Sequence, residues 1–133
     1  MITHVEKMRV NWVDTDASGL IHYTSALRYF EVAEHALLRK LFGPEGGPTE
    51  RGFLMPRVHV EADYKAPLRY PEPFECEARV ADVGRSALTF AYEARRNDGV
   101  VCLVGRIVAV AVGANGKPTP FPDAFRETLR NAL

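Results

Sequence analysis

The sequence has little of several features that mark other classes of protein. Its two cysteines, Cys76 and Cys102, lie in apolar strand-like stretches and form no CxxC pair, which predicts buried reduced thiols rather than a disulfide framework or a zinc site. The longest uninterrupted apolar stretch lies near Ile107–Val112, whereas a membrane helix needs about 20 residues. The segment Met1–Lys7 lacks the apolar region of a signal peptide. We therefore expect a cytoplasmic protein with no membrane partner.

The sequence also lacks an excess of charge of either sign. It contains 17 Lys and Arg against 17 Asp and Glu, whereas a nucleic-acid-binding domain usually carries a basic excess. We therefore expect no nucleic-acid partner. Its 133 residues, 47% of them hydrophobic, fit a single domain over 1–133. A domain of this size buries only about two-thirds of its unfolded surface, which favours association with another subunit.

Four stretches alternate between apolar and polar residues, and this pattern predicts strands with one covered face and one wetter face. They are 6–12, 58–65, 74–80 and 88–95. In the second stretch we expect the apolar side chains to share the covered face; these are Val58, Val60, Ala62 and Tyr64. Faces of this kind are typical of an antiparallel sheet.

Two further features extend the predicted sheet. The sequence Asn97-Asp98-Gly99 predicts a tight hairpin turn, because Gly, Asn and Asp tolerate positive φ. The stretch Val100–Val112 is apolar on both faces apart from Arg106. We interpret it as a long central strand.

One segment, Thr24–Leu41, has helical rather than strand periodicity. Thr24 or Ser25 can cap its start, and Gly43-Pro44 ends it. Its apolar positions recur at helical spacing; they are Ala26, Phe30, Ala33, Leu37 and Leu41. A second, short helix is expected over 122–133. The order of elements predicts an α+β fold, a five-stranded antiparallel sheet wrapped around one long central helix.

The loop before the long helix carries the most informative residues. Asp14, Asp16, Gly19 and His22 precede a helix start, where free N–H groups and the positive end of the dipole can polarise a carbonyl oxygen. A carboxylate beside such a site can attack the carbonyl or activate water. The same residues also fit an Asx-rich turn before a capped helix, which composition alone favours. Asp-x-Asp is also a metal-site fragment, but no matching ligand cluster follows, so we expect no metal.

The stretch Arg9–Glu31 resembles the hotdog-fold acyl-CoA thioesterases, most closely the branch that contains 4-hydroxybenzoyl-CoA thioesterase and the YbgC-type enzymes. It shares with that branch an Asp-x-Asp-x-x-Gly loop, an aromatic/His pair and a helix with Leu-Arg-Tyr-Phe-Glu. Val60–Pro73 and Gly84–Phe90 resemble later segments of the family. The order His22-Tyr23 is reversed relative to the YbgC-type enzymes, and Thr24-Ser25 stands where many members have Asn.

The resemblance implies hydrolysis of an acyl-CoA thioester, with coenzyme A as part of the substrate and no separate cofactor. It implies that Asp16 is the catalytic carboxylate, as nucleophile or as general base, and that the Tyr23 backbone N–H polarises the thioester carbonyl. His22 either donates a hydrogen bond to the substrate or lines the loop. Asp14 is interpreted as structural.

The resemblance also implies a coenzyme A site and an oligomer. Gly19 is expected to permit the tight loop near the substrate, and Arg85 with Ser86 to hold the nucleotide phosphates. Family members pair through their sheets, so we expect a homodimer, or a homotetramer made of two dimers, with active sites at the junction between subunits.

Other interpretations remain open from the residues alone. Asp16 and His22 could serve an enoyl-thioester hydratase, and the chain could be a thioester-binding module without catalysis. Some hotdog thioesterases carry their catalytic acid on the helix, where this chain has Glu34. The neighbours of Glu34 suggest an outward-facing charge, and Glu31 with His35 suggests a surface pair at i, i+4.

Overall fold

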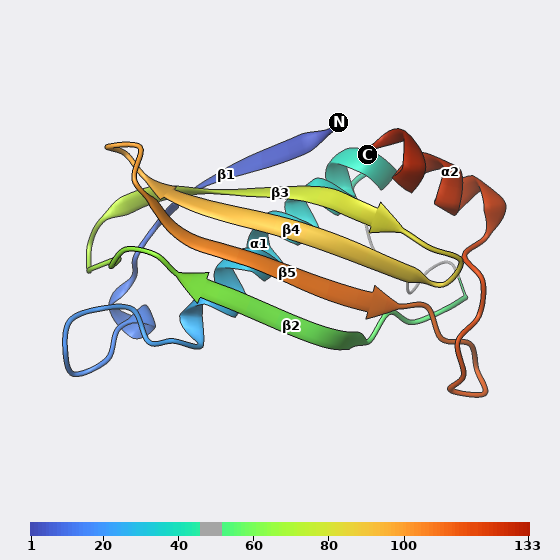
Figure 1. Ribbon diagram of the computed structural model, residues 1–133, viewed down its shortest axis with the longest axis horizontal. Helices are drawn as coiled ribbons and strands as arrows, with labels where there is room; N and C mark the ends of the chain where they lie inside the picture. Colours follow the sequence, from blue (N-terminus) through green and yellow to red (C-terminus); the bar gives the residue numbers. More distant parts are fainter. Residues whose placement is uncertain (46–51) are drawn as a thin grey trace.

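The computed structural model describes residues 1–45 and 52–133. It contains a five-stranded antiparallel sheet and two helices (Figure 1). In chain order the elements are β1 (Thr3–Arg9), the 3₁₀ turn η1 (Trp12–Asp14), α1 (Ser25–Phe42), β2 (Arg57–Tyr64), β3 (Pro73–Val83), β4 (Ala87–Arg96), β5 (Val101–Val110) and α2 (Asp123–Asn131). The predicted α+β class and the order of elements are confirmed.

The strands lie in the order β1-β3-β4-β5-β2, with antiparallel neighbours throughout. β4 is therefore the middle strand. The stretch that we expected to be central forms β5, which is internal but lies second from the edge. The turn predicted at Asn97–Gly99 joins β4 to β5, and Gly99 has the positive φ of 86° that this turn requires.

The first strand is shifted from its predicted position. We expected residues 6–12, but β1 runs from Thr3 to Arg9, and the side chain of Trp12 lies in η1 and is 75% exposed. The chain leaves the sheet because the Asn11 N–H donates a 2.8 Å hydrogen bond to the Asp14 carboxylate. This local polar contact closes a turn that competes with continued strand pairing.

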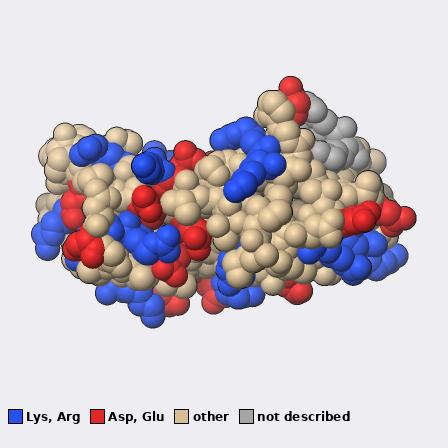
Figure 2. Space-filling view, turned by 90° about the horizontal axis from the view of Figure 1, so that it is seen from above, with Lys and Arg blue, Asp and Glu red and all other residues tan. Residues whose placement is uncertain are grey.

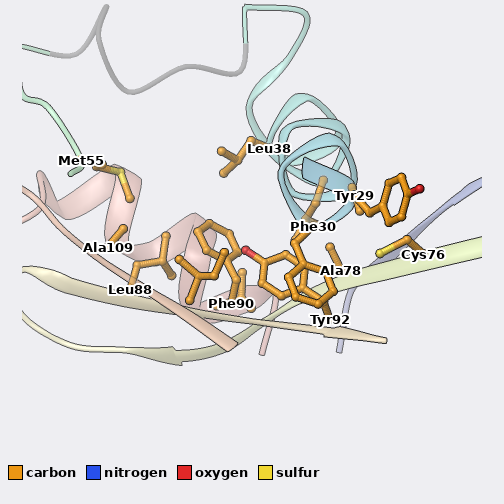
Figure 3. Close-up of a cluster of buried hydrophobic side chains, with 14 of the residues drawn as sticks. Tyr29, Phe30, Leu38, Met55, Cys76, Ala78, Leu88, Phe90, Tyr92 and Ala109 are labelled. Carbon is orange, nitrogen blue, oxygen red and sulfur yellow. The ribbon is translucent and has the colours of Figure 1, made fainter. Parts of the chain in front are cut away.

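The long helix lies on one face of the sheet (Figures 1 and 3), where four of its five predicted apolar residues are buried and Leu41 is partly buried. Phe30 stacks on Tyr92 of β4, with ring centroids 4.6 Å apart and an interplanar angle of 11°. Tyr29 meets Phe74 of β3 edge to face. Gly105 of β5 lies directly beneath Phe30 and leaves no room for a Cβ atom. The close approach of α1 to the sheet therefore depends on a glycine.

The ends of α1 show how local polar groups act. Gly43 follows the helix with φ of 92°, as predicted for its C-terminal end. At the start, Thr24 occupies the predicted N-cap position, but its side chain makes no capping hydrogen bond to the helix. The Thr24 hydroxyl lies 2.7 Å from His22 Nδ1, and the Ser25 hydroxyl donates to the Asp14 carbonyl. Both hydroxyls therefore bind the preceding loop instead of the helix N–H groups.

The face expected to be covered on β2 is exposed in the single chain. Val58 is 62% exposed, and Val60 and Tyr64 are also exposed. β2 is an edge strand. The main contacts of α1 are with β1 and β3, which lie toward the opposite edge of the sheet. An apolar face at this edge is therefore left without a covering layer in one copy of the chain.

Cys76 and Cys102 are buried and free, as predicted. Burial raises the pKa of the Cys76 thiol to about 12. Within residues 1–45 and 52–133, no helix is long and apolar enough to cross a membrane.

Candidate functional site

The loop between η1 and α1 is a short, closed hairpin. Thr15 and Ile21 pair as an antiparallel bridge. Inside this pair, the Asp16 N–H donates to the Leu20 carbonyl at 3.0 Å and the Gly19 N–H donates to the Asp16 carbonyl at 3.1 Å. Gly19 has φ of 81°, which a residue with a Cβ adopts only at a cost. These contacts hold Asp16 in one place on the surface.

The Asp16 carboxylate is exposed and ionised at neutral pH. The Ser18 hydroxyl and the Ser18 N–H both donate to Oδ1, the latter at 2.8 Å. These two hydrogen bonds, that of the hydroxyl first, lower the pKa of Asp16 below its ordinary value. The side chain is therefore charged, oriented and open to a ligand, which is the state that a nucleophile or a general base needs.

Tyr23 lies in the turn immediately before α1 and has an unused main-chain donor. The His22 N–H donates to the Asp14 carbonyl at 2.7 Å, and the Ser25 N–H donates to the His22 carbonyl at 2.9 Å. Within the described parts of the chain, no group accepts a hydrogen bond from the Tyr23 N–H. The Tyr23 carbonyl accepts a hydrogen bond from the Tyr64 hydroxyl, which ties β2 to the helix start. A free N–H at a helix N-terminus can polarise a carbonyl oxygen.

His22 makes local contacts that restrict its imidazole ring. The Thr24 N–H donates to Nδ1 at 3.2 Å, and the ring stacks on Tyr23 with centroids 4.5 Å apart. Because Nδ1 accepts this bond, Nε2 carries the proton of the neutral ring and is the nitrogen that can donate to a ligand.

Asp14 is fully buried and differs sharply from Asp16. Its carboxylate accepts hydrogen bonds of 2.8 Å from the Asn11 N–H and from the Tyr29 hydroxyl, and it pairs with Arg28. The Asp-x-Asp sequence therefore presents one free carboxylate, that of Asp16. The structural interpretation of Asp14 agrees with these contacts.

Arg85 and Ser86 lie in the connection between β3 and β4, far from Asp16 in the same chain. The loop that carries Asp16 comes after β1, whose last residue, Arg9, pairs with Pro73 at the start of β3, whereas Arg85 comes after Val83 at its end. A strand of 11 residues spans about 33 Å at about 3.3 Å per residue. One chain therefore does not bring the expected phosphate contact to its own Asp16.

Glu34 is a buried residue whose environment we predicted wrongly. We expected an outward-facing charge, but Glu34 is 1% exposed, accepts a 2.7 Å hydrogen bond from the Tyr92 hydroxyl and pairs with Arg57. It follows Phe30 by four positions, so the helical spacing places it on the covered face. His35 Nε2 lies 3.7 Å from Glu34 instead of pairing with Glu31.

A cleft of about 380 Å³ runs along α1. One wall is formed by the helix and the other by β2 and β5. The cleft is lined by Leu27, Glu31, Glu34, His35, Arg57, Val60 and Ile107. On the face of the molecule seen from above in Figure 2, acidic and basic side chains are interspersed.

Comparison with known proteins places the chain in a family. The family model described as "Thioesterase-like superfamily" matches residues 10–129. A 1,4-dihydroxy-2-naphthoyl-CoA hydrolase of Synechococcus elongatus is 25% identical over 128 residues, which are 91% of this chain and 90% of that protein. The acyl-CoA thioester hydrolase YbgC of Escherichia coli is 25% identical over 121 residues, 89% of each chain.

A solved structure shares the fold. The crystal structure of an Aquifex aeolicus protein, 28% identical, superposes with a TM-score of 0.85 and covers 94% of this chain and 98% of that one. The family match extends over the loop that carries Asp16, over α1 and over the whole of β2 to β5. This chain belongs to the thioesterase-like superfamily.

Proposed function

We propose that this protein is a hotdog-fold thioesterase, with its sheet curved around α1, that hydrolyses an acyl-coenzyme A to a free acid and coenzyme A. The observation that carries the proposal is that one short loop holds both an ionised, exposed carboxylate, at Asp16, and an unused N–H, at Tyr23. Membership of the thioesterase-like superfamily and the acyl-CoA substrates in the names of its relatives support a thioester substrate.

In the proposed reaction, the thioester oxygen accepts a hydrogen bond from the Tyr23 N–H, and the positive end of α1 stabilises the negative charge that develops there. As a nucleophile, Asp16 forms a bond to the carbonyl carbon while the carbon–sulfur bond breaks. Water then hydrolyses the resulting mixed anhydride and releases the acid. As a general base, Asp16 instead takes a proton from water as the hydroxide attacks, and passes that proton to the departing thiolate.

The leaving group explains why few side chains are needed. A thiol has a pKa of about 8–9, so coenzyme A departs as a thiolate with little help from an acid. His22 is assigned a supporting part, in which Nε2–H donates a hydrogen bond to the substrate. Gly19 keeps the loop tight beside the acyl-CoA.

We further propose that the working enzyme is a homodimer, or a homotetramer of two dimers, that joins through β2. The exposed edge of β2 and the uncovered side chains of Val58 and Val60 support this arrangement. Antiparallel pairing of two β2 strands reverses one copy relative to the other. The Arg85 and Ser86 end of one chain then lies toward the catalytic loop of its partner, where these residues can hold the phosphates of coenzyme A.

The test compares Asp16→Asn with a matched substitution, Asp98→Asn. Asp98 is also an exposed carboxylate that accepts a hydrogen bond from the N–H two residues later, at 3.0 Å, and its pKa is also lowered. Thiol release from aromatic, short-chain and long-chain acyl-CoAs is followed with a thiol reagent. We expect Asp16→Asn to lose about 10²–10⁴-fold in turnover, and Asp98→Asn to keep the wild-type rate.

Three outcomes contradict the hydrolase proposal. Asp16→Asn could retain wild-type thiol release. The protein could add water to an enoyl-CoA without releasing thiol, which identifies a hydratase that uses Asp16 and His22. It could also bind acyl-CoAs saturably without turnover across the whole panel, which identifies a binding module.

A further inference from the structure

Asp14 is the buried charged residue at the base of the catalytic loop. We infer that Asp14 is a positioning residue, whose carboxylate and carbonyl together set the Asp16 carboxylate and the Tyr23 N–H in their relative places. The inference rests on the proposed function, because that function assigns the chemistry to Asp16 and Tyr23. It adds a residue that acts on the reaction without touching the substrate.

The carboxylate of Asp14 joins the turn before the loop to the helix after it. Oδ2 accepts hydrogen bonds of 2.8 Å from the Asn11 N–H and from the Tyr29 hydroxyl. Oδ1 faces the guanidinium of Arg28. An amide in its place has only one acceptor oxygen and turns N–H groups toward a donor. A carboxylate is therefore the side chain that serves all three neighbours.

The carbonyl of Asp14 holds the residues on both sides of Tyr23. It accepts a 2.7 Å hydrogen bond from the His22 N–H and a 2.8 Å hydrogen bond from the Ser25 hydroxyl. These two donors occupy the same oxygen. The Tyr23 N–H lies between them along the chain, has no acceptor in the described residues and stays available to a ligand.

Asp16 is linked to the same anchor from the other side of the loop. Thr15 separates it from Asp14 and forms the bridge with Ile21, and the Asp16 N–H donates to the Leu20 carbonyl at 3.0 Å. A shift of Asp14 therefore moves both strands of the small hairpin. Reacting groups are sensitive to such a shift, since a displacement of about 1 Å can cost about 10²-fold in rate.

A contribution to stability alone does not account for this arrangement. Buried ion pairs often contribute little net stability, because desolvation offsets their attraction. Another buried carboxylate, that of Glu34 in α1, also has a tyrosine hydroxyl and an arginine as partners. Tyr92 donates to Glu34 and its ring contacts Phe30 and Phe90, all of which lie outside the loop, so it provides an internal comparison with Tyr29 and Asp14.

The experiment compares Tyr29→Phe with Tyr92→Phe and adds Asp14→Asn. Each tyrosine substitution removes one hydroxyl that donates to a buried carboxylate, at 2.8 Å and 2.7 Å respectively. For the acyl-CoA with the highest turnover, we expect kcat to fall about 10-fold in Tyr29→Phe and about 10²-fold in Asp14→Asn, with KM changed less than about threefold. Tyr92→Phe should lower Tm by a similar amount to Tyr29→Phe and keep kcat.

Two further measurements separate positioning from general loosening. The acid-side pKa of the kcat/KM profile should be the same in Tyr29→Phe as in the wild type, because Asp16 keeps its bonds from Ser18. Amide hydrogen exchange over residues 15–25 should be faster in Tyr29→Phe and unchanged in Tyr92→Phe. This second measurement needs no substrate.

The inference is wrong if Asp14→Asn keeps the wild-type kcat, or if Tyr29→Phe and Tyr92→Phe lower kcat equally. It is also wrong if exchange over residues 15–25 does not change in Tyr29→Phe. Loss of activity in Asp16→Asn together with full activity in Asp14→Asn contradicts the inference and leaves the proposed function standing. Full activity in Asp16→Asn contradicts the proposed function itself.

Discussion

Substitution of Gly105 by alanine should strongly destabilise the fold, because α1 approaches the sheet most closely at this residue. A Cβ atom at Gly105 would lie 2.6 Å from Phe30 Cζ and 3.0 Å from the Glu61 carbonyl oxygen. Real Cβ atoms do not approach a ring carbon this closely, so either the ring or the strand must move.

Neither can move easily. Phe30 is fully buried, and its ring stacks on Tyr92 at a centroid distance of 4.6 Å. Gly105 is paired on both sides, with Tyr92 of β4 and Ala62 of β2. Overpacking of a core typically costs about 1–3 kcal/mol. Since both the ring and the main chain block the methyl group, we expect about 3 kcal/mol, which corresponds to a fall in Tm of about 10 °C.

Gly113→Ala provides the matched control. The nearest described atom to a Cβ there is Asn115 Oδ1 at 3.7 Å, an ordinary contact, and Gly113 has no positive φ. Urea unfolding is followed by far-UV circular dichroism, because Trp12 is exposed and reports poorly on the core. Adding Phe30→Leu to Gly105→Ala should recover part of the loss, so that the two changes together cost less than their sum.

The reasoning is refuted if Gly105→Ala unfolds at the same urea concentration as Gly113→Ala. It is also refuted if Phe30→Leu and Gly105→Ala destabilise additively. Either result would mean that the contact between helix and strand relaxes without cost.

Three other predictions follow from the same structure. Ser18→Ala removes the hydroxyl that contributes most to the lowered pKa of Asp16, so the acid limb of the kcat/KM profile should move to higher pH; an unmoved limb would exclude Asp16 as the titrating group. Cys76, whose pKa is raised to about 12 by burial, should not react with a thiol reagent at pH 8 until urea unfolds the protein. Val60→Asp on the β2 edge should shift the protein to a smaller species in sedimentation, whereas Val5→Asp on the opposite edge strand should leave the assembly unchanged.

Local elements were predictable because their signals lie within a few residues. The helix expected over 24–41 runs from Ser25 to Phe42, and the turn at Asn97–Gly99 has the positive φ expected of its glycine. The strands expected at 74–80 and 88–95 lie within β3 and β4. Periodicity and turn chemistry are properties of neighbouring residues, so they act before any distant contact forms.

Position within the sheet was less predictable. The apolar side chains of β2 alternate as a covered face should, yet Val58 and Val60 are exposed because their strand lies at the edge. Trp12 was assigned to a strand, but the bond between the Asn11 N–H and the Asp14 carboxylate turns the chain first. Alternation indicates that a face exists, whereas the packing of other elements decides whether anything covers it.

The resemblance of the loop sequence to a known family predicted the candidate site at Asp16 and Tyr23, which lie seven positions apart before a helix. Chain connectivity alone keeps them close. The folded chain alone shows that Asp14 is buried beneath that loop, that Tyr92 and Arg57 are the partners of Glu34, and that Arg85 lies at the far end of β3. The helical spacing of Glu34 from Phe30 indicated the covered face, but the partners of a buried side chain depend on which elements pack together and on the direction in which each strand runs.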